Sequence, residues 1–329
     1  MWFKNQNWRR WSQLYFLLLY MTAGFFLYKA VHSLPELGET AFSYRFPALE
    51  GFLPISATVG LKYWLFTGQY DPIHPAGLTI LLLAILSAIL LKRGFCSHLC
   101  PIGTVSELAY KLRQRLLPKQ LILPKTLTYF LKVPKYLLLG FLLFVVFIGM
   151  PVMDIAMFIR SPYNTISEIK MMNFFLEPSP LTVKVILSLV ILSLVISNFW
   201  CRFLCPYGAL LSVFSLFSST GIQRDASRCI GCHSCERSCP NQLCITDRPA
   251  VRSPDCTICQ NCIAACPKGA ISIGSGFGRI KMTPHLYTWS LLGLFCLGIF
   301  TAMLAGHWQS AELAAYWLQY ASMAGQIFH

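Results

Sequence analysis

The sequence predicts a polytopic α-helical membrane protein of about five transmembrane helices, with a small cysteine-rich α+β module inserted before the last helix. Three observations support this fold class. Hydrophobic residue types make up 55% of the 329 residues and charged types only 12%, whereas soluble domains carry about 25% charged residues. Apolar stretches of about 20 residues, enough to cross a bilayer, recur along the chain. Eight of the 14 cysteines form one repeated spacing.

Five apolar stretches are expected to span the membrane. The first follows a basic N-terminal segment and has no small-x-small cleavage site after it, so we favour an uncleaved anchor over a signal peptide. The basic amphipathic stretch at 104–120 is typical of a helix that lies on anionic lipid. The tail at 307–329 is aromatic and nearly uncharged, which suggests a short interfacial helix. The expected spans lie near residues 12–31, 74–91, 136–153, 181–199 and 286–306.

The cysteine-rich stretch contains one spacing twice. It reads Cys229-x2-Cys232-x2-Cys235-x3-Cys239-Pro240 and then Cys256-x2-Cys259-x2-Cys262-x3-Cys266-Pro267. This is the spacing of bacterial two-cluster ferredoxins, in which the fourth cysteine of each run binds the other cluster. The spacing therefore predicts two [4Fe-4S] clusters. The expected ligands are Cys229, Cys232, Cys235 and Cys266 for one cluster, and Cys239, Cys256, Cys259 and Cys262 for the other.

Two other interpretations of the eight cysteines are a disulfide framework and a pair of zinc sites. Disulfides need an oxidising compartment, and zinc sites seldom use four cysteines in one run followed by proline. We therefore prefer two clusters in a reducing compartment. The chain then divides into a membrane domain at 1–221 with four spans, a ferredoxin module at 222–274, and the fifth span with an outer tail at 275–329.

A second cysteine motif occurs twice, at an offset of 105 residues. Phe95-Cys96-x2-Leu99-Cys100-Pro101-x-Gly103 matches Trp200-Cys201-x2-Leu204-Cys205-Pro206-x-Gly208. Each copy follows an even-numbered span, so the repeat is parallel rather than inverted. Cysteines at i and i+4 share a helix face, and two such pairs would bring four thiols together. They would hold a third metal centre or a redox-active dithiol pair; the alternative is that they only pack. The thiols are those of Cys96, Cys100, Cys201 and Cys205.

The basic residues are distributed unevenly. With the N-terminus inside, the inner segments 1–11, 92–135 and 200–284 hold 21 of the 27 Lys and Arg residues. The positive-inside rule therefore places the N-terminus and both kinds of cysteine motif on the cytoplasmic side of a bacterial inner membrane, with the C-terminus periplasmic. Membrane topology then explains the net charge of +14, which argues against nucleic-acid binding.

The paired Cys-x3-Cys-Pro units after membrane spans, with a two-cluster module behind them, resemble the NapH-type membrane polyferredoxins, a group that includes NosR and CcoG. The resemblance covers most of residues 10–275. It implies a membrane redox protein that passes electrons between the quinone pool and a partner oxidoreductase. A fifth span and an outer tail depart from the simpler NapH plan, so partners do not transfer directly. Further matching stretches are Glu50-Gly-Phe-Leu-Pro-Ile, Leu61-Lys-Tyr, Ser161-Pro-Tyr and Cys201-Arg-x-Leu-Cys-Pro-Tyr-Gly-Ala.

These features predict an electron carrier whose partners are the lipid bilayer, the quinone pool and a redox partner protein. No general base, nucleophile or nucleotide-binding loop stands out. One alternative is an assembly factor of the CcoG type, a metal (copper) reductase whose paired cysteines bind the metal substrate. Another is a redox sensor, although no output domain is visible.

Some single residues carry expectations of their own. Arg202 is expected to lower the thiol pKa of its neighbour Cys201. A quinol site needs a proton acceptor near the interface, and nothing in the sequence chooses among Asp71, Asp154 and Glu168. Structural or interfacial roles, without chemistry, are expected for His98, Cys244, Cys296 and Trp308.

Overall fold

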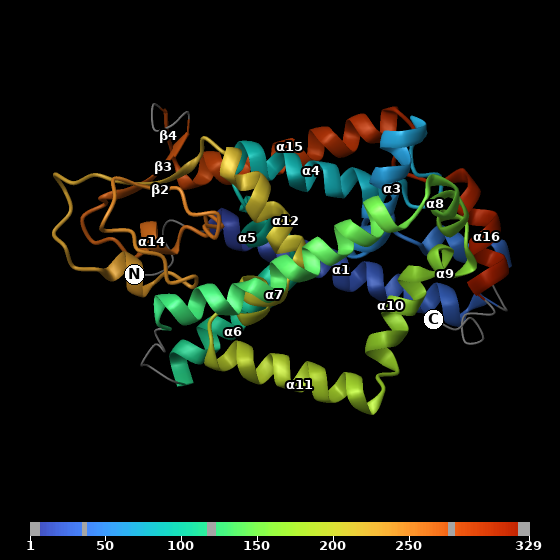
Figure 1. Ribbon diagram of the computed structural model, residues 1–329, viewed down its shortest axis with the longest axis horizontal. Coiled ribbons are helices and arrows are strands. Elements are labelled where there is room, and N and C mark those ends of the chain that lie inside the picture. The colour runs from blue at the N-terminus through green and yellow to red at the C-terminus, as the bar shows by residue number, and fades with distance from the viewer. Residues whose placement is uncertain (1–6, 35–37, 117–122, 276–279, 322–329) are drawn as a thin grey trace. The chain divides into compact units, whose positions relative to one another are not determined.

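The computed structural model describes residues 7–34, 38–116, 123–275 and 280–321 (Figure 1). Most of these residues are helical, and the strands among them form one small sheet. Parts of the expected inner segments and of the tail, at 1–6, 117–122, 276–279 and 322–329, lie outside the described residues.

The chain folds as two compact units, each built from three separate segments. The first unit consists of Met1–Leu17, Ala84–Leu139 and Leu187–Phe295. The second unit consists of Leu18–Leu83, Gly140–Ile186 and Cys296–His329. The first unit therefore contains all the expected cysteine ligands. The sequence-based division at residues 221 and 274 stays a prediction.

Three helices among the described residues are long and apolar enough to cross a membrane. They are α1 (Asn7–His32), α7 (Lys125–Phe144) with its π-helical continuation Val145–Gly149, and α15 (Pro284–Leu304). A fourth span forms if α10 (Ser167–Leu176) and α11 (Pro180–Val195), which meet at 79°, are taken together. Prolines cause this bend, because they cannot continue one helix but suit the first turn of the next.

The expected span at 74–91 forms α4 (Pro75–Leu91), which is strongly apolar but only 17 residues long. At 1.5 Å per residue it covers about 25 Å, less than the ~30 Å of a hydrocarbon core. The fold class of a polytopic helical membrane protein is confirmed, and the count of five spans stays a prediction.

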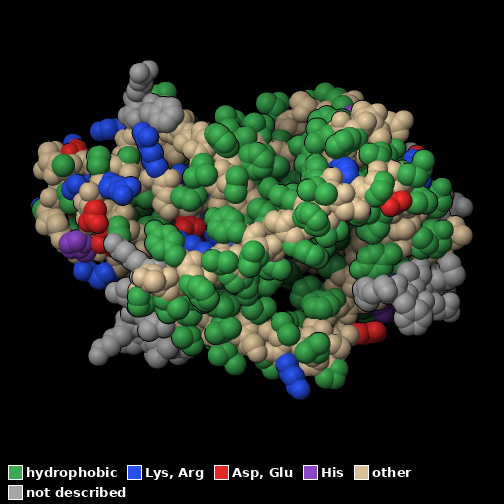
Figure 2. Space-filling view, viewed as in Figure 1, with side chains coloured by type: hydrophobic (Ala, Val, Ile, Leu, Met, Phe, Trp, Pro, Cys, Tyr) green, Lys and Arg blue, Asp and Glu red, His purple; other side chains and the backbone are tan. Residues whose placement is uncertain are grey.

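Large apolar side chains cover the outside of the spanning helices (Figure 2). On α7, Phe130 is 74% exposed and Phe141 is 69% exposed. Exposing so much apolar surface to water is unfavourable, whereas contact with lipid chains is not. Lys and Arg instead gather over the β-stranded module, as Figure 2 shows.

The β-stranded module contains a four-stranded antiparallel sheet in the order β2-β1-β3-β4. Ile222 of β1 pairs with Val251 of β2 and Ile273 of β3, so these apolar side chains face one buried side. The buried cysteines of the module pack in the same core. The strands are β1 (Gly221–Arg224), β2 (Ala250–Val251), β3 (Ile271–Ser275) and β4 (Ile280–Met282).

The second unit has its own core around α3 (Pro54–Thr67), the short helices α8 (Val152–Ile159) and α9 (Pro162–Thr165), and α16 (Ala311–Ala321). The helix expected in the tail is α16, and its Trp317 is fully buried in this core. The Lys62 ammonium of α3 donates to the carbonyls of Val146, Phe147 and Met150. It thereby satisfies carbonyls that the π-helical end of α7 leaves free.

Candidate metal centre

The two cysteine runs of the module fold into the same local backbone. In each run the residue before the second cysteine has a positive φ, +68° at Gly231 and +49° at Ile258. The residue after that cysteine is also left-handed, +53° at His233 and +64° at Gln260. A one-turn helix follows each time, α13 (Ser234–Arg237) or α14 (Asn261–Ala264), and carries the third cysteine of its run. The repeated spacing thus corresponds to a repeated loop.

One cysteine set lines a small pocket at the exposed side of the module. The pocket measures about 20 Å³, and Lys268 and His233 also line it. One of the four thiols, that of Cys232, is exposed. The backbone N–H of Ala270 donates to a second, Cys266 Sγ, at 3.2 Å. The cysteines that line this pocket are Cys229, Cys232, Cys235 and Cys266.

The other set lines a second pocket of about 20 Å³ with apolar walls that include Ile222, Ile245 and Val251. Burial, and then the charge of neighbouring thiols, raises the pKa of Cys239 to about 12. Three of these cysteines are buried and Cys259 is half-buried. Four thiols that repel one another as thiolates fit a site that supplies positive charge, such as iron. The cysteines of this pocket are Cys239, Cys256, Cys259 and Cys262.

The pocket linings divide the eight cysteines as the spacing predicts, including the exchange of Cys239 and Cys266 between the runs. All fourteen cysteines are free, so no disulfide framework forms. Among the described residues no group of three or more His, Cys, Asp or Glu side chains converges on one metal ion. This geometry disfavours zinc sites but not a cluster, which holds its ligands further apart. The ligand assignment itself stays a prediction.

The two Cys-x3-Cys-Pro units bring their four thiols together. Cys96 lies in α5 (Gly94–His98) and Cys201 in the π-helical turn η4 (Trp200–Leu204). Burial, followed by Cys96, raises the pKa of Cys100 to about 12. Burial also raises the pKa of Cys201, with contributions from the thiols of Cys205, Cys100 and Cys96. The four half-buried side chains therefore lie close enough for their thiols to interact electrostatically.

The i and i+4 spacing suggested that each pair of cysteines shares one helix face. In the structure each pair lies instead at a junction between two helices. The proline after the second cysteine starts a new helix, α6 (Pro101–Leu116) or α12 (Pro206–Phe214). Cys205 itself is extended, at φ −66° and ψ 111°, and its Sγ accepts the N–H of Gly208 at 3.2 Å. The motif thus caps a helix with a thiol.

The glycine of the first motif is a steric requirement, and the glycine of the second motif occupies a tight site. A Cβ on Gly103 would lie 1.9 Å from the carbonyl oxygen of Cys96. A Cβ on Gly208 would lie 3.4 Å from the carbonyl oxygen of Cys201 and 3.0 Å from an Arg93 nitrogen. The new helix therefore packs its first turn directly against the backbone of the first cysteine.

Arg93 is the cation beside the four thiols, and the expectation that Arg202 would lower the pKa of Cys201 is wrong. The Arg202 guanidinium donates to Gln242 at 3.2 Å and lies over the ring of Phe203. The pKa of Cys201 is raised instead, chiefly by burial. The buried Arg93 guanidinium interacts electrostatically with Cys96 and Cys205. Sequence adjacency pointed to the wrong arginine.

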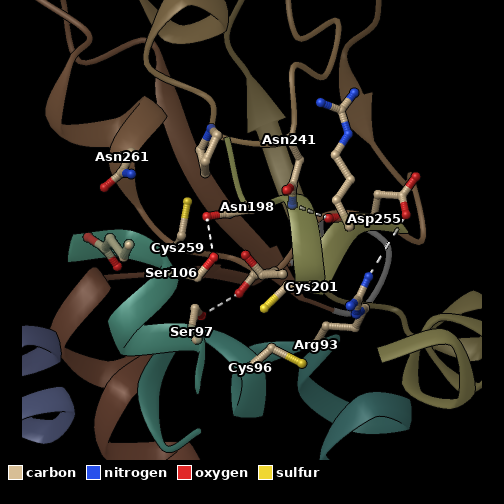
Figure 3. A pocket seen from close by; sticks show the side chains of 15 residues that line it. Arg93, Cys96, Ser97, Ser106, Asn198, Cys201, Asn241, Asp255, Cys259 and Asn261 are labelled. Atoms are coloured by element: carbon tan, nitrogen blue, oxygen red, sulfur yellow. Dashed lines mark hydrogen bonds and ion pairs between the residues drawn. The ribbon is translucent and has the colours of Figure 1, made fainter. Parts of the chain in front are cut away.

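A cavity of about 40 Å³ joins the paired thiols to the module (Figure 3). Cys96, Cys201 and Cys259 all line it, so one expected cluster ligand shares its space with two of the paired cysteines. Ser97 Oγ donates to the carbonyl of Thr257 at 2.6 Å, which ties α5 to the loop of Cys259. The second cysteine pocket is therefore the one that adjoins the paired thiols.

A buried carboxylate fixes the same loop to α7. Asp255 accepts from Lys132 at 2.6 Å and Lys135 at 3.1 Å, and lies 3.9 Å from Arg93. Burial alone would raise the pKa of Asp255, but Lys135 and Lys132 outweigh burial and lower it to about 2. Sequence reasoning missed this group, because its partners are about 120 residues away and no motif marks them.

A second network joins α1 to α6 within the first unit. The guanidinium of Arg9 binds both carboxylate oxygens of Glu107, at 2.6 and 2.7 Å, and Gln13 adds a bond at 2.8 Å. Arg9 also donates to the carbonyl of Ser97 at 3.3 Å. This network holds the first Cys-x3-Cys-Pro unit in place. His98, which lies inside this cysteine motif, is fully buried, and burial lowers its pKa to about 3. Both observations agree with the structural role expected for His98.

Comparison with known protein families gives two matches. A family described as "4Fe-4S binding domain" matches residues 73–120 and 180–223, which contain both Cys-x3-Cys-Pro units. A family described as "4Fe-4S dicluster domain" matches residues 221–270, which contain both cysteine runs.

Several named proteins are similar in sequence to this chain. YccM of Escherichia coli, named as an electron transport protein, is 36% identical over 94% of this chain and 88% of its own length. The ferredoxin-type protein NapH of Escherichia coli is 25% identical over 83% of this chain and 91% of its own. NirI of Paracoccus denitrificans is 30% identical over 51% of this chain and 24% of its own. No solved structure matches the chain.

Proposed function

Because the chain belongs to the family of YccM, an iron–sulfur electron-transport family of the inner membrane, we propose that it relays electrons between the quinone pool and a partner oxidoreductase. The observation that carries this proposal is the pair of pockets, each lined by four cysteines from both runs. The spanning helices keep the relay at the membrane, where quinones dissolve.

The proposal assigns one [4Fe-4S] cluster to each pocket. When bound, such a cluster takes up and releases one electron at a time. The apolar walls of the Cys239 pocket exclude water from its cluster, and burial tunes the cluster potential. The Cys232 pocket lies at the exposed side of the module, so its thiols offer the shorter route to a soluble partner.

The four paired thiols are proposed as a third centre, either a metal site or a redox-active dithiol. The cavity that Cys96 and Cys201 share with Cys259 supports this role, because a centre on these thiols would then lie beside the proposed Cys239 cluster rather than the Cys232 cluster. Arg93 supplies positive charge next to Cys96 and Cys205, which would stabilise thiolate ligands.

The orientation of the chain is part of the proposal. We place the N-terminus and the ferredoxin module in the cytoplasm and the C-terminus in the periplasm. The distribution of Lys and Arg supports this placement. The cytoplasm is also the reducing compartment that so many free thiols require.

The proposal is tested by changing Cys96, Cys100, Cys201 and Cys205 together to serine. If the thiols belong to the relay, the variant keeps two clusters in the module but exchanges electrons with an added quinone, menadione, much more slowly than the wild type. An unchanged quinone rate with a lost ability to reduce Cu(II) would contradict the relay. That result would favour the alternative function, a metal reductase of the assembly-factor type.

A further inference from the structure

The second unit encloses a cluster of charged side chains that the iron–sulfur sites do not use. Its members come from η2 (Pro47–Phe52), the segment just before it, the loop between α3 and α4, and α10. All are buried: the exposed fraction is 0% for His74 and Glu168, 1% for Glu50, 2% for Asp71 and 8% for Arg45. Ionisable groups buried in a membrane protein are costly to keep and usually functional.

One arginine in this cluster serves two carboxylates. Arg45 Nη2 lies 2.6 Å from Glu50 Oε1, and Arg45 Nε donates to Glu168 Oε1. The other oxygen of Glu50 accepts the N–H of Gly77, at the start of α4, at 2.8 Å. Glu168 Oε2 is buried and has no hydrogen-bond partner within the described part of the chain. With both carboxylates ionised, the three groups lack one positive charge.

His74 is placed to provide that charge by taking up a proton. Its Nε2 lies 2.7 Å from the carbonyl oxygen of Asn164, which can only accept, so Nε2 carries a hydrogen. Its Nδ1 lies 3.5 Å from Glu50 Oε1, another acceptor. A neutral imidazole has only one N–H. If Nε2 carries that hydrogen, the lone pair of Nδ1 faces the carboxylate oxygen of Glu50. A second proton, on Nδ1, would satisfy both contacts and balance the charge.

Ionisable side chains surround His74. The charged groups facing His74 are Glu50, Arg45 and Asp71. Burial alone would raise the pKa of Glu50, but Arg45 and His74 outweigh it and lower the pKa. Asp71 Oδ1 accepts the N–H groups of Ile73 and His74 at 2.9 Å, while Oδ2 is buried without a partner among the described residues. One charged and one under-bonded carboxylate therefore flank the imidazole.

We propose that the His74–Glu50 pair is the site that gives a proton to, and takes one from, a membrane quinone. This inference rests on the proposed link to the quinone pool. In the reducing direction a quinone takes two electrons, delivered singly by the iron–sulfur centres, and two protons, and becomes a quinol. The Nδ1–H bond of His74 breaks as the first O–H bond forms. Water then protonates the His74–Glu50 pair again, and the pair gives the second proton to the quinone. Oxidation of a quinol follows the same steps in reverse.

The same geometry selects among the three acidic residues that the sequence left open. Asp71 and Glu168 belong to the cluster, whereas Asp154 lies exposed on α8. His74 and Glu50 were not among the candidates. A purely structural ion network is the competing explanation, since removing one member of such a network is destabilising by itself. The test must therefore separate proton transfer from stability.

The experiment follows the reoxidation of reduced clusters by two oxidants. The full-length protein is purified anaerobically, reduced with dithionite, freed of reductant, and mixed with menadione or with ferricyanide. Menadione needs protons as well as electrons, whereas ferricyanide takes one electron and no proton. The variants are His74→Gln and Glu50→Gln. The matched controls are Asp154→Asn and His307→Gln, whose ring stacks on Tyr70 in the same unit.

The proposal expects His74→Gln and Glu50→Gln to slow reoxidation by menadione about 100-fold, as loss of a general acid does. Reoxidation by ferricyanide stays at the wild-type rate, and both controls behave as the wild type. In the wild type the menadione rate falls as pH rises, because the protonated pair is the competent form. In His74→Gln that pH dependence is lost.

Several results would overturn the inference. A His74→Gln protein that reacts with menadione as fast as the wild type would remove the role of the pair. If His74→Gln does not hold its clusters, the wild-type pH profile decides, and a menadione rate that is constant from about pH 6 to about pH 9 would contradict a histidine donor. A wild type that ferricyanide reoxidises but menadione does not would instead refute the quinone link itself.

Discussion

Gly103 sets the geometry of the first Cys-x3-Cys-Pro unit at the scale of a single residue. Its missing side chain lets α6 begin against the carbonyl of Cys96, where a Cβ would come within 1.9 Å. Backbone atoms cannot yield to such a contact, so alanine here must displace the helix or the cysteine loop. Packing thereby explains the glycine of the first motif.

Gly103→Ala should destabilise the protein by about 2–4 kcal/mol, since it forces backbone out of place. The matched control is Gly140→Ala in α7, where nothing lies within 4 Å of an added Cβ. That change should be neutral or stabilise by up to about 1 kcal/mol through helix propensity. Unfolding in detergent checks both. Equal stabilities for the two variants would refute the close approach at Gly103.

Glu107 is a residue whose charge state matters for stability. Burial alone would raise the pKa of its carboxyl, but Arg9 outweighs burial and holds the pKa well below its usual range. The ionised carboxylate therefore adds stability at neutral pH. That contribution is present above the usual carboxyl pKa of about 4.3 and is lost as pH falls below it.

Glu107→Gln leaves Arg9 buried without its counter-charge, which should reduce stability at pH 7 by about 3–5 kcal/mol. The difference from the wild type should shrink as the pH falls below about 4.3, because the wild type then loses the same charge. Unfolding of both proteins across this range checks the sign. A gap that widens on acidification would show that the ion pair does not stabilise the fold.

At this scale the cysteine spacing predicted which cysteines share a pocket, including the exchange of Cys239 and Cys266 between the runs, because that spacing has few solutions. It did not predict the groups around them, and the assignment of the cysteines as ligands stays a prediction. Arg93 could not be separated from Arg202, because both are next to a motif and only the fold decides which guanidinium reaches the thiols. His74 and Glu50 lie 24 positions apart and carry no motif that joins them.

At the scale of elements, the loop at residues 255–259 is held to α7 by one carboxylate, which faces two lysines of α7 and Arg93 just before α5. Asp255 faces Lys132, Lys135 and Arg93. The loop carries two of the cysteines that line the second pocket. The exposed pocket of the module has no comparable tie to a spanning helix in the described structure.

Asp255→Asn should therefore loosen the second pocket and spare the first. Three cations lose their counter-charge, at a cost of about 3–5 kcal/mol as for other buried ion networks. We expect the Cys239 cluster to be lost first, leaving a protein with one cluster by EPR. The control is Asp225→Asn, a half-buried acid on the same module that pairs with the exposed Arg228. Equal cluster content in both variants would show that the tie to α7 is unimportant.

Helices were easier to predict than their roles. Apolar length alone placed α1, α7 and α15, because a spanning segment must be apolar over its whole extent. It did not anticipate that α4 would fall short of a full span or that α11 would need α10 to reach one. Nor did it anticipate that Trp317 would pack the tail helix on a core formed by residues distant in sequence. The expected place of that helix at the membrane interface stays a prediction.

At the scale of the whole molecule, the orientation proposed for the chain in the membrane rests on the distribution of Lys and Arg. Cys244 provides a test, because it is exposed and belongs to neither cysteine motif. A membrane-impermeant maleimide should label it in inverted vesicles and not in intact spheroplasts. Cys244→Ser is the control for labelling elsewhere. Labelling in spheroplasts would place the module on the periplasmic side and contradict the proposed topology.

The central claim is that one membrane-bound chain carries two cubane clusters in crossed cysteine sets. Counting iron and acid-labile sulfide per chain tests it most directly, in anaerobically purified wild type and in the variant with serine at residues 96, 100, 201 and 205. The account predicts about eight iron atoms in the variant, and about twelve in the wild type if the paired thiols hold a third cubane. A colourless, iron-free variant would contradict it.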